Sequence, residues 1–386
     1  MPILQSFKYA RLEGALLVLT LGLTLPLARR LNAAPVETNL VIGLLLPPEE
    51  AEASSIREGV TLAVEQANRG TAAEHVSVVT RGRQGQWGAD AVEAARMVTD
   101  DGVQGLIGPG NGAATHLLLQ VAGRTAVPVL SLCADSSVTQ TGVPWMLRLV
   151  PSTAQEGHAL LKELQDSRRG FLTRCVALIP SERAGREIAK DLKRAFEGSK
   201  FELEKVLTLQ PATEDYDAVS RQVLESRADV ALVWLDPTPA GRLVKALHAA
   251  RFNGTLAGPA RLRSSDFVTS AGAASEGFMT TELALDSAGE AKFRDFETAF
   301  RSRFGHQPAA MSVFSYDATA LLIHILENHR VDAVRAFPLS FSWPGASGTL
   351  SFDARGNRNL GFRPAARRLN ADRNVITEAS KGNEQR

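Results

Sequence analysis

The sequence predicts an α/β protein with two doubly wound, Rossmann-like lobes, and three features predict it. Apolar runs of strand length alternate with segments of helical spacing along most of the chain. Glycine and small polar residues fill the loops after several of these runs, as in 108–113. The chain has 386 residues and 44% hydrophobic content, which is enough for two globular domains. Strand–helix alternation of this kind builds parallel sheets.

The expected elements follow in order from residue 40. Leu40–Leu46 is a continuous apolar run, as in a strand that is buried on both faces. Ser54 then begins a helical pattern that ends at Gly70, because serine favours helix starts and glycine favours helix ends. The other expected strands are Val76–Thr80, Val103–Ile107, Val127–Leu132, Cys175–Ile179, Phe201–Leu207, Val230–Leu235, Thr255–Ala257, Leu339–Ser342 and Leu350–Phe352. The other expected helices cover 88–101, 113–124, 184–198, 217–226, 239–251, 288–304 and 312–329.

Residues 1–34 predict a secretory signal peptide. Lys8 and Arg11 precede the apolar run Ala15–Ala28, and Asn32-Ala33-Ala34 offers small residues for cleavage. The run has fourteen residues, whereas a membrane span needs roughly 20. Two arginines directly after the run leave a retained membrane anchor as the alternative. We therefore expect a periplasmic or otherwise extracytoplasmic protein.

Composition and charge argue against several functions. The formal net charge is +1 and no basic run is present, so we expect no nucleic-acid partner. Cys133 and Cys175 do not form a disulfide framework, and the sequence leaves open whether they pair. The histidines are dispersed, and His324 with His329 lacks the helical spacing of a metal-ligand pair. We expect no metal and no cofactor.

The stretch from Val103 to Gly157 predicts a binding crevice. It contains two strand–loop–helix units, whose loops at 108–113 and 131–137 carry small and polar groups. In open parallel sheets, ligands bind outside the carboxyl ends of the strands. Both loops are therefore expected to face one crevice.

Four segments together resemble one protein family. They are Ile56–Asn68; Gly105–Gly112 with Val127–Ser131; Tyr316-Asp317-Ala318; and Gly345–Gly356. In order and spacing, from residue 38 to about 365, the chain resembles the type I periplasmic solute-binding proteins, which include the leucine/isoleucine/valine-binding proteins of ABC importers. The resemblance implies a binding protein that performs no chemistry.

The resemblance also implies two lobes that close on a small ligand about a hinge of three crossovers. A monomer of this kind would deliver its ligand to an ABC permease or to another envelope partner. We expect crossovers near Arg148–Ser152, Glu276–Thr281 and Ala336–Ser340. Lobe one would then be 38–150 with 281–335, lobe two 151–280 with 336–370, and 371–386 a flexible tail.

The expected pocket departs from that of the amino-acid-binding relatives. In those relatives, a serine after the 103–107 strand and a small-x-threonine pattern after the 127–132 strand hold the ligand carboxylate, and by spacing these fall on Gly112, Cys133 and Asp135 of this chain. Gly112 has no hydroxyl, and a carboxylate at Asp135 would repel an anionic ligand. An acidic partner for the ligand ammonium would follow Gly258-Pro259, where this chain has Ala260 and Arg261. We therefore expect a small polar ligand other than a plain branched-chain amino acid.

The candidate ligand-binding residues come from five loops that follow expected strands. Asp135 offers an acceptor for a ligand, and an N-cap beside Ser136 is the equal alternative. Asp236 faces the cleft or caps the helix 239–251, and Arg261 meets an anion or is a solvated loop residue. The full set is Asn111, Gly112, Ser131, Cys133 and Asp135 in lobe one, and Ala184, Asp236, Thr238 and Arg261 in lobe two; at Ala184 the relatives would carry an aromatic residue.

Two other functions remain in view. Gly108–Ala113 fits G-x-G-x-x-A, with Asp135 about twenty residues later, as in NAD-dependent oxidoreductases. Pro109 inside the motif, the export segment and the lack of a catalytic grouping argue against that function. The second alternative is an envelope sensor or scaffold that uses the same two-lobed fold with a degenerate pocket.

Overall fold

The computed structural model confirms the predicted fold class of two α/β lobes. The described residues are 39–48, 50–69, 75–82, 88–108, 110–143, 145–167, 173–282, 285, 287–328, 342–359 and 367–368. All of them belong to the unit Asn39–Arg386. The expected signal segment 1–34 and the expected tail 371–386 lie outside the described residues.

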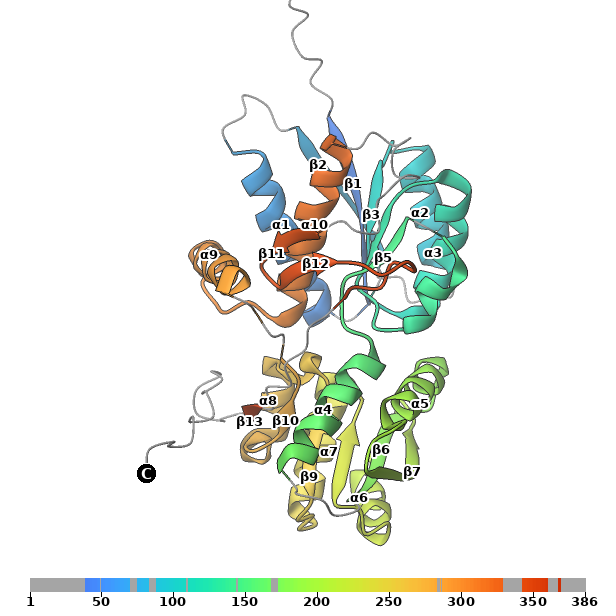
Figure 1. Ribbon diagram of the computed structural model, residues 1–386, viewed down its shortest axis with the longest axis vertical. Coiled ribbons are helices and arrows are strands. Elements are labelled where there is room, and N and C mark those ends of the chain that lie inside the picture. Colours follow the sequence, from blue (N-terminus) through green and yellow to red (C-terminus); the bar gives the residue numbers. More distant parts are fainter. Residues whose placement is uncertain are drawn as a thin grey trace, which may run out of the picture. The chain divides into compact units, whose positions relative to one another are not determined.

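The first sheet has five parallel strands in the order β2-β1-β3-β4-β5 (Figure 1). Alternate residues of β1 enter different cores: Leu44 packs with helices α1 and α10, and Leu45 packs with α2 and α3. This two-residue period explains the continuous apolar run, because both faces of the sheet are covered. The strands are β1 Leu40–Leu46, β2 Val76–Gly82, β3 Gly105–Ile107, β4 Val129–Ser131 and β5 Met146–Arg148. The helices are α1 Glu50–Ala67, α2 Ala89–Thr99, α3 Gly112–Thr125, α9 Ser287–Phe304 and α10 Ala310–Asn328.

The second sheet has the strand order β13-β10-β9-β8-β6-β7, and only its edge strand β13 is antiparallel among the described strands. Leu178 of β6 packs with α7 and α8, while Ala177 packs with α4 and α5. The strands are β6 Thr173–Pro180, β7 Phe201–Leu209, β8 Val230–Val233, β9 Thr255–Gly258, β10 Met279–Thr280 and β13 Arg367–Arg368. The helices are α4 Thr153–Ser167, α5 Arg183–Phe196, α6 Tyr216–Glu225, α7 Pro237–Ala249 and α8 Ser265–Ala271, with short 3₁₀ turns η1 Ser136–Thr141, η2 Ala260–Leu262 and η3 Gly272–Ser275.

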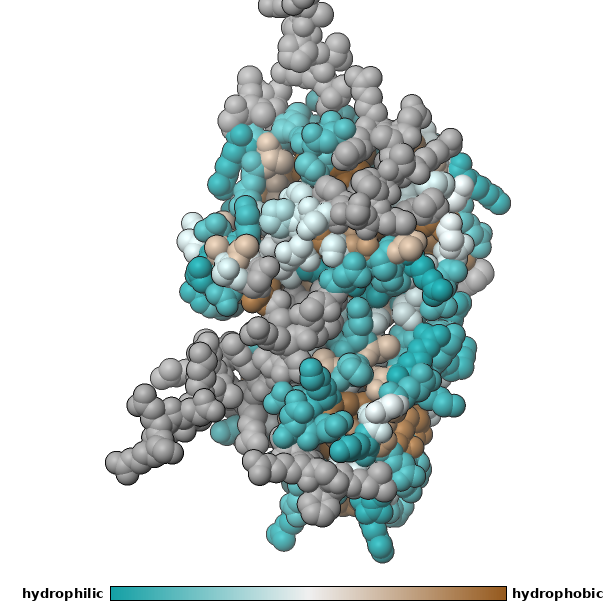
Figure 2. Space-filling view, viewed as in Figure 1, coloured by the Kyte–Doolittle hydropathy of each residue, from teal (hydrophilic) through white to brown (hydrophobic). Residues whose placement is uncertain are grey.

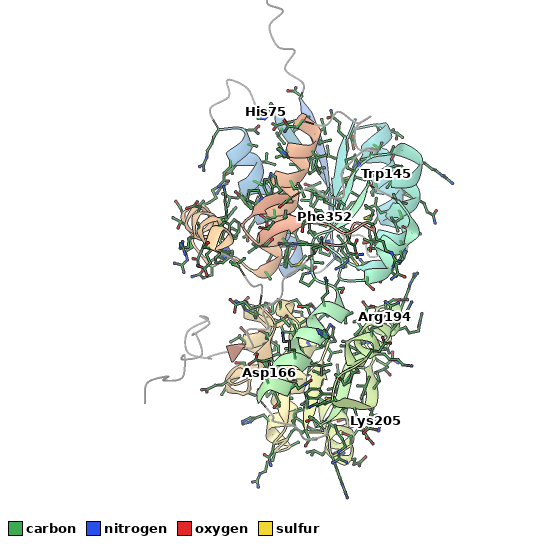
Figure 3. The ribbon with its side chains drawn as sticks, viewed as in Figure 1. His75, Trp145, Asp166, Arg194, Lys205 and Phe352 are labelled. Carbon is green, nitrogen blue, oxygen red and sulfur yellow. The ribbon has the colours of Figure 1, made fainter. Side chains whose placement is uncertain are left out.

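A hairpin of β11 (Ser342–Gly345) and β12 (Gly348–Ser351) lies within 336–370, which the sequence predicts to be part of lobe two. Leu350 of this hairpin and the following Phe352 pack in the core that β1, α1 and α10 form (Figure 3, Phe352). The buried carboxylate of Asp317 in α10 accepts hydrogen bonds from the Ala346 and Ser347 N–H groups, both at 2.7 Å. Strand β13, in contrast, pairs with β10 in the second sheet.

Two further details differ from the sequence prediction. Helix α1 begins at Glu50, so Ser54 lies inside it; Glu50 and Glu52 in its first turn favour a helix N-terminus there. Strand β5, which the sequence does not predict, ends at Arg148, where the expected crossover Arg148–Ser152 begins. Its three buried residues pair with β4, and so extend the first sheet up to that crossover.

On the face that Figure 2 shows, most of the described surface is hydrophilic. Its exposed large hydrophobic residues are Val92, Val206 and Leu224, which come from different elements. Among the described helices, none combines the length and the apolar character that crossing a membrane requires.

Candidate functional site

The loops that follow β3 and β4 lie side by side at the carboxyl end of the first sheet. The two strands are hydrogen-bonded neighbours, with Leu106 opposite Val129 and Ile107 opposite Leu130. Parallel neighbours bring their carboxyl ends to one edge. The expected crevice residues Asn111, Gly112, Ser131, Cys133 and Asp135 therefore come from two adjacent loops.

Asn111 is the N-cap of helix α3. Its side-chain oxygen accepts a hydrogen bond of 2.8 Å from the Ala114 N–H, and its backbone is extended, as an N-cap requires. Gly112, the first residue of the helix, lies against the side chain of Asp135. A Cβ at residue 112 would overlap the Asp135 carboxylate and would lie 3.0 Å from Asp135 Cβ. Gly112 thus makes room for Asp135.

Ser131 and Cys133 are buried and hydrogen-bond to the backbone of their own loop. Ser131 Oγ accepts from the Cys133 N–H at 3.1 Å, and Cys133 Sγ accepts from the Asp135 N–H at 3.3 Å. Burial raises the pKa of the Cys133 thiol to about 12, so the group is uncharged at neutral pH. Cys133 and Cys175 are both free thiols. These two side chains shape the loop and leave Asp135 as its charged group.

Asp135 caps the 3₁₀ turn η1. Its Oδ1 accepts hydrogen bonds from the Ser137 N–H at 2.9 Å and from the Ser137 hydroxyl at 2.7 Å. Its Oδ2 lies 3.6 Å from His116 Nε2, and the side chain is 11% exposed. The capping alternative is therefore confirmed, while Oδ2 lies beside Gly112.

In the second lobe, Asp236 pairs with Arg261 rather than capping helix α7. Asp236 Oδ1 lies 3.1 Å from Arg261 Nη1, and the two side chains are 64% and 39% exposed, respectively. Asp236 makes no side-chain cap hydrogen bond to α7, which corrects the capping alternative. Thr238 is half-buried in the first turn of α7, and Ala184 is exposed in the first turn of α5.

Several hydrogen bonds join the crevice loops of lobe one to lobe two, including one from the Arg194 guanidinium to the Ser136 hydroxyl at 3.4 Å. The Ser136 hydroxyl donates to Asp191 Oδ1 of α5 at 2.9 Å, and Arg194 of the same helix lies 3.1 Å from that oxygen (Figure 3). Burial raises the pKa of Asp191. Asp191 and His116 are not predicted as site residues from the sequence, because a helical pattern does not show which residue contacts another segment.

Two buried side chains, Arg148 and Glu156, form hydrogen bonds at the first and second crossovers. Neither is predicted as a site residue from the sequence. Arg148 donates to the Val150 carbonyl at 2.5 Å and to Asn357 Oδ1 at 3.0 Å, and burial lowers its pKa. Glu156 Oε1 accepts from the Ala260 N–H at 2.8 Å and from the Thr281 hydroxyl at 2.7 Å. Burial raises the pKa of Glu156. Together these bonds hold the segments that cross between the lobes.

Two surface hollows in the described part of the chain lie apart from the candidate site residues. Among the residues that the structure describes, no three His, Cys, Asp or Glu side chains are grouped to bind a metal ion. Two open hollows of about 320 and 590 Å³ lie on the second lobe. They are lined by residues of 223–229 with 251–254, and by Glu214, Tyr216, Arg242, Lys245 and Ser270, none of which is a candidate site residue.

Comparisons with known proteins show the family and the fold of the chain. A family described as periplasmic binding protein matches residues 42–363. No curated protein sequence matches the chain.

Many solved structures share the fold at low sequence identity. The branched-chain amino acid transporter substrate-binding protein of Streptococcus pneumoniae, solved with isoleucine, has a TM-score of 0.75 and 18% identity, over 88% of this chain and 97% of that one. A solute-binding protein of R. palustris, solved with benzoate, has a TM-score of 0.76 and 18% identity, over 88% and 95%. A second R. palustris protein, solved with 4-hydroxybenzoate, has a TM-score of 0.75 and 16% identity, over 87% and 94%. At this identity, the likeness establishes the fold.

Proposed function

The chain belongs to the periplasmic binding protein family, and from this premise we propose that it captures a small polar solute between its two lobes and delivers it to an ABC importer. The family consists of binding proteins and not enzymes, as the sequence analysis expects. The oxidoreductase alternative is thereby removed. Asn111, inside the G-x-G-x-x-A pattern, is a helix cap.

The family match over 42–363, together with two parallel sheets that each end in polar loops, carries this proposal. Ligand contacts from both lobes exist only when the lobes are closed, so a ligand shifts the population toward the closed state. The lobes that we propose are 38–150 with 281–335 and the hairpin 342–351, and 151–280 with β13. The ligand would lie between 108–112 and 131–135 on one side and 181–185, 236–238 and 259–261 on the other.

We propose that the ligand is not a plain branched-chain amino acid. The loop after β3 lacks a hydroxyl at Gly112 and faces the Asp135 carboxylate. On the other lobe, the Ala260 N–H is bonded to Glu156, and the adjacent Arg261 is paired with Asp236. The carboxylate of a zwitterion would meet no uncommitted cation among these described residues, and an unpaired charge in a closed cleft is costly.

A second candidate function is an envelope sensor or scaffold that keeps the fold with a degenerate pocket. It is favoured by the internal pairing of the candidate side chains: Asp135 with Ser137, and Asp236 with Arg261. Such a protein would bind a protein partner with equal affinity in the presence and absence of a small solute. A transport protein would be encoded beside permease and ATPase genes.

The location and partners form part of the proposal. Family membership indicates a place outside the cytoplasm. We propose that residues 1–34 direct export, that cleavage leaves a mature chain beginning near Ala34, and that the mature protein is a monomer. N-terminal sequencing of the exported protein checks the cleavage, and a full-length cytosolic chain would refute it.

The decisive experiment is mass spectrometry of the small molecules that copurify with protein isolated natively, followed by calorimetric titration of the molecule found. We expect one molecule per chain and no micromolar binding of leucine, isoleucine or valine. Micromolar binding corresponds to about 8 kcal/mol. Tight leucine binding would refute the ligand class, and a protein that neither copurifies with nor binds any small solute would favour the sensor function.

A further inference from the structure

We propose that Asp135 decides the chemical class of the ligand: it bars a carboxylate from the lobe-one loops and selects an amine or a neutral hydrogen-bond donor there. The inference rests on the proposed function of solute capture between the lobes. It assigns a specificity-determining role to the Gly112–Asp135 pair, in addition to the capping role of Asp135.

The glycine at 112 is explained by Asp135 and not by the backbone. Gly112 is absent from the described residues with positive φ, so its backbone accepts any L-residue. A Cβ at this position, however, would overlap Asp135 Oδ2 and would lie 3.1 Å from Asp135 Cγ. A side chain at 112 and the observed position of Asp135 therefore exclude one another. At the start of α3, the Asp135 carboxylate therefore occupies the space that a side chain at 112 would fill.

The Asp135 carboxylate is also held in place from the other side. Ser137 donates two hydrogen bonds to Oδ1, and the Asp135 N–H donates to the buried sulfur of Cys133. The side chain is 11% exposed, so moving it aside for a ligand group would break its two hydrogen bonds from Ser137. An anionic ligand group near Gly112 would thus face a fixed negative charge.

The basic side chains near Asp135 already have hydrogen-bond partners. His116 Nε2 hydrogen-bonds with the Ser137 hydroxyl at 2.8 Å, and Arg148 is bonded to Asn357 and to the Val150 carbonyl. Arg194 is bonded to Asp191. A ligand carboxylate would find no uncommitted cation among these residues. An amine or amide N–H, in contrast, would find Asp135 Oδ2 as a charged acceptor.

The test uses wild-type protein and the Asp135→Asn variant against small solutes that share a carbon skeleton but differ in the polar group. The set includes benzoate, benzamide and benzylamine, and isoleucine with isoleucinol, first by thermal shift and then by calorimetry. For wild-type protein we expect the amine or amide to bind with a Kd at least about tenfold below that of its carboxylate. In Asp135→Asn that ratio should approach one, and in Gly112→Ser/Asp135→Ala the carboxylate should bind more tightly than in wild-type protein.

Asp215→Asn is the matched control, because Asp215 is also a capping aspartate, at α6 in the second lobe, and is exposed. It should leave the ratio unchanged. Carboxylates that bind wild-type protein more tightly than their amines, or a preference that Asp135→Asn leaves intact, would overturn the inference and leave solute capture standing. Failure of every solute to bind any of these proteins would overturn the inference, whereas the proposed function would be overturned only if no small solute copurified with the protein either.

Discussion

Charged side chains at the crossovers and at the crevice differ in burial and in hydrogen-bond partners. Around the crossovers and the β11–β12 hairpin, Arg148, Glu156, Asp317 and Arg358 are buried and bond mainly to backbone groups. At the crevice of the second lobe, the Asp236–Arg261 pair is largely exposed and bonds side chain to side chain. The first set is therefore expected to control stability, and the second to be available to a ligand.

Among these buried residues, we expect Asp317 to contribute most to stability. Its carboxylate accepts hydrogen bonds from the Ala346 and Ser347 N–H groups and from the Ser347 hydroxyl, and Arg358 bonds to the same turn. Burial raises the pKa of Asp317, and burial lowers the pKa of Arg358 to about 10. These groups join α10 to the hairpin.

Asp317→Ala is expected to produce the largest effect. Removing one member of a buried charged network costs about 3–5 kcal/mol, because its partners are left unpaired. The free energy of unfolding from urea denaturation measures it. Asp217→Ala, at an exposed position of α6, is the control and should change stability by less than about 0.5 kcal/mol. Equal effects in the two variants would contradict the stabilising role of the network.

Glu156→Ala is expected to have an intermediate effect. It removes the acceptor of the Ala260 N–H and of the buried Thr281 hydroxyl. Leaving buried donors without a partner costs about 1–3 kcal/mol. Glu156→Gln keeps a side-chain oxygen at the same place and should retain most of the stability. If both variants lost the same amount, the hydrogen bonds to Oε1 would not be the cause.

The pH dependence of stability sharpens the same comparison. Burial raises the folded-state pKa of Glu156 above its ordinary value of 4.5. Between pH 4.5 and the raised pKa of the folded state, Glu156 binds more protons in the folded protein than in the unfolded chain. Its contribution to stability therefore falls as pH rises through that range. Relative to Glu156→Gln, wild-type protein should gain stability as pH is lowered from neutral to 4.5. Urea denaturation of both proteins at several pH values measures it, and a difference that is constant with pH would contradict a raised pKa.

The sequence predicts the lobes better than it predicts the contacts between distant segments. Runs such as Leu40–Leu46 and Val230–Leu235 reveal strands, because burial on both sheet faces requires continuous apolar residues. The lobe on which the β11–β12 hairpin packs depends instead on Asp317, which is separated from its partner Ser347 by 30 positions. No local pattern reports such a pair.

The candidate site could likewise be predicted only in part. The loops after β3 and β4 could be predicted, since each follows an apolar strand and contains small polar residues. The position of Asp135 against Gly112 could not, because it depends on the register of two neighbouring strands and on a side-chain conformation that Ser137 holds. The pairing of Asp236 with Arg261 likewise follows from the adjacency of β8 and β9, and a helix cap is the expectation from sequence alone.

Asp236→Ala is expected to have the smallest effect on stability and tests whether the exposed pair serves binding. Exposed ion pairs contribute about 0–1 kcal/mol, and Asp236 makes no cap hydrogen bond whose loss would add to this. The melting temperature should therefore barely change. The affinity for the copurified solute should fall, because the variant removes an exposed carboxylate from a loop at the carboxyl end of the second sheet and leaves Arg261 without its partner.

Arg261→Ala, measured in parallel, separates loss of the carboxylate from loss of the pair. Unchanged affinity in both variants would remove the pair from the binding site, and a loss of stability above about 1 kcal/mol would show that the pair belongs with the buried set instead.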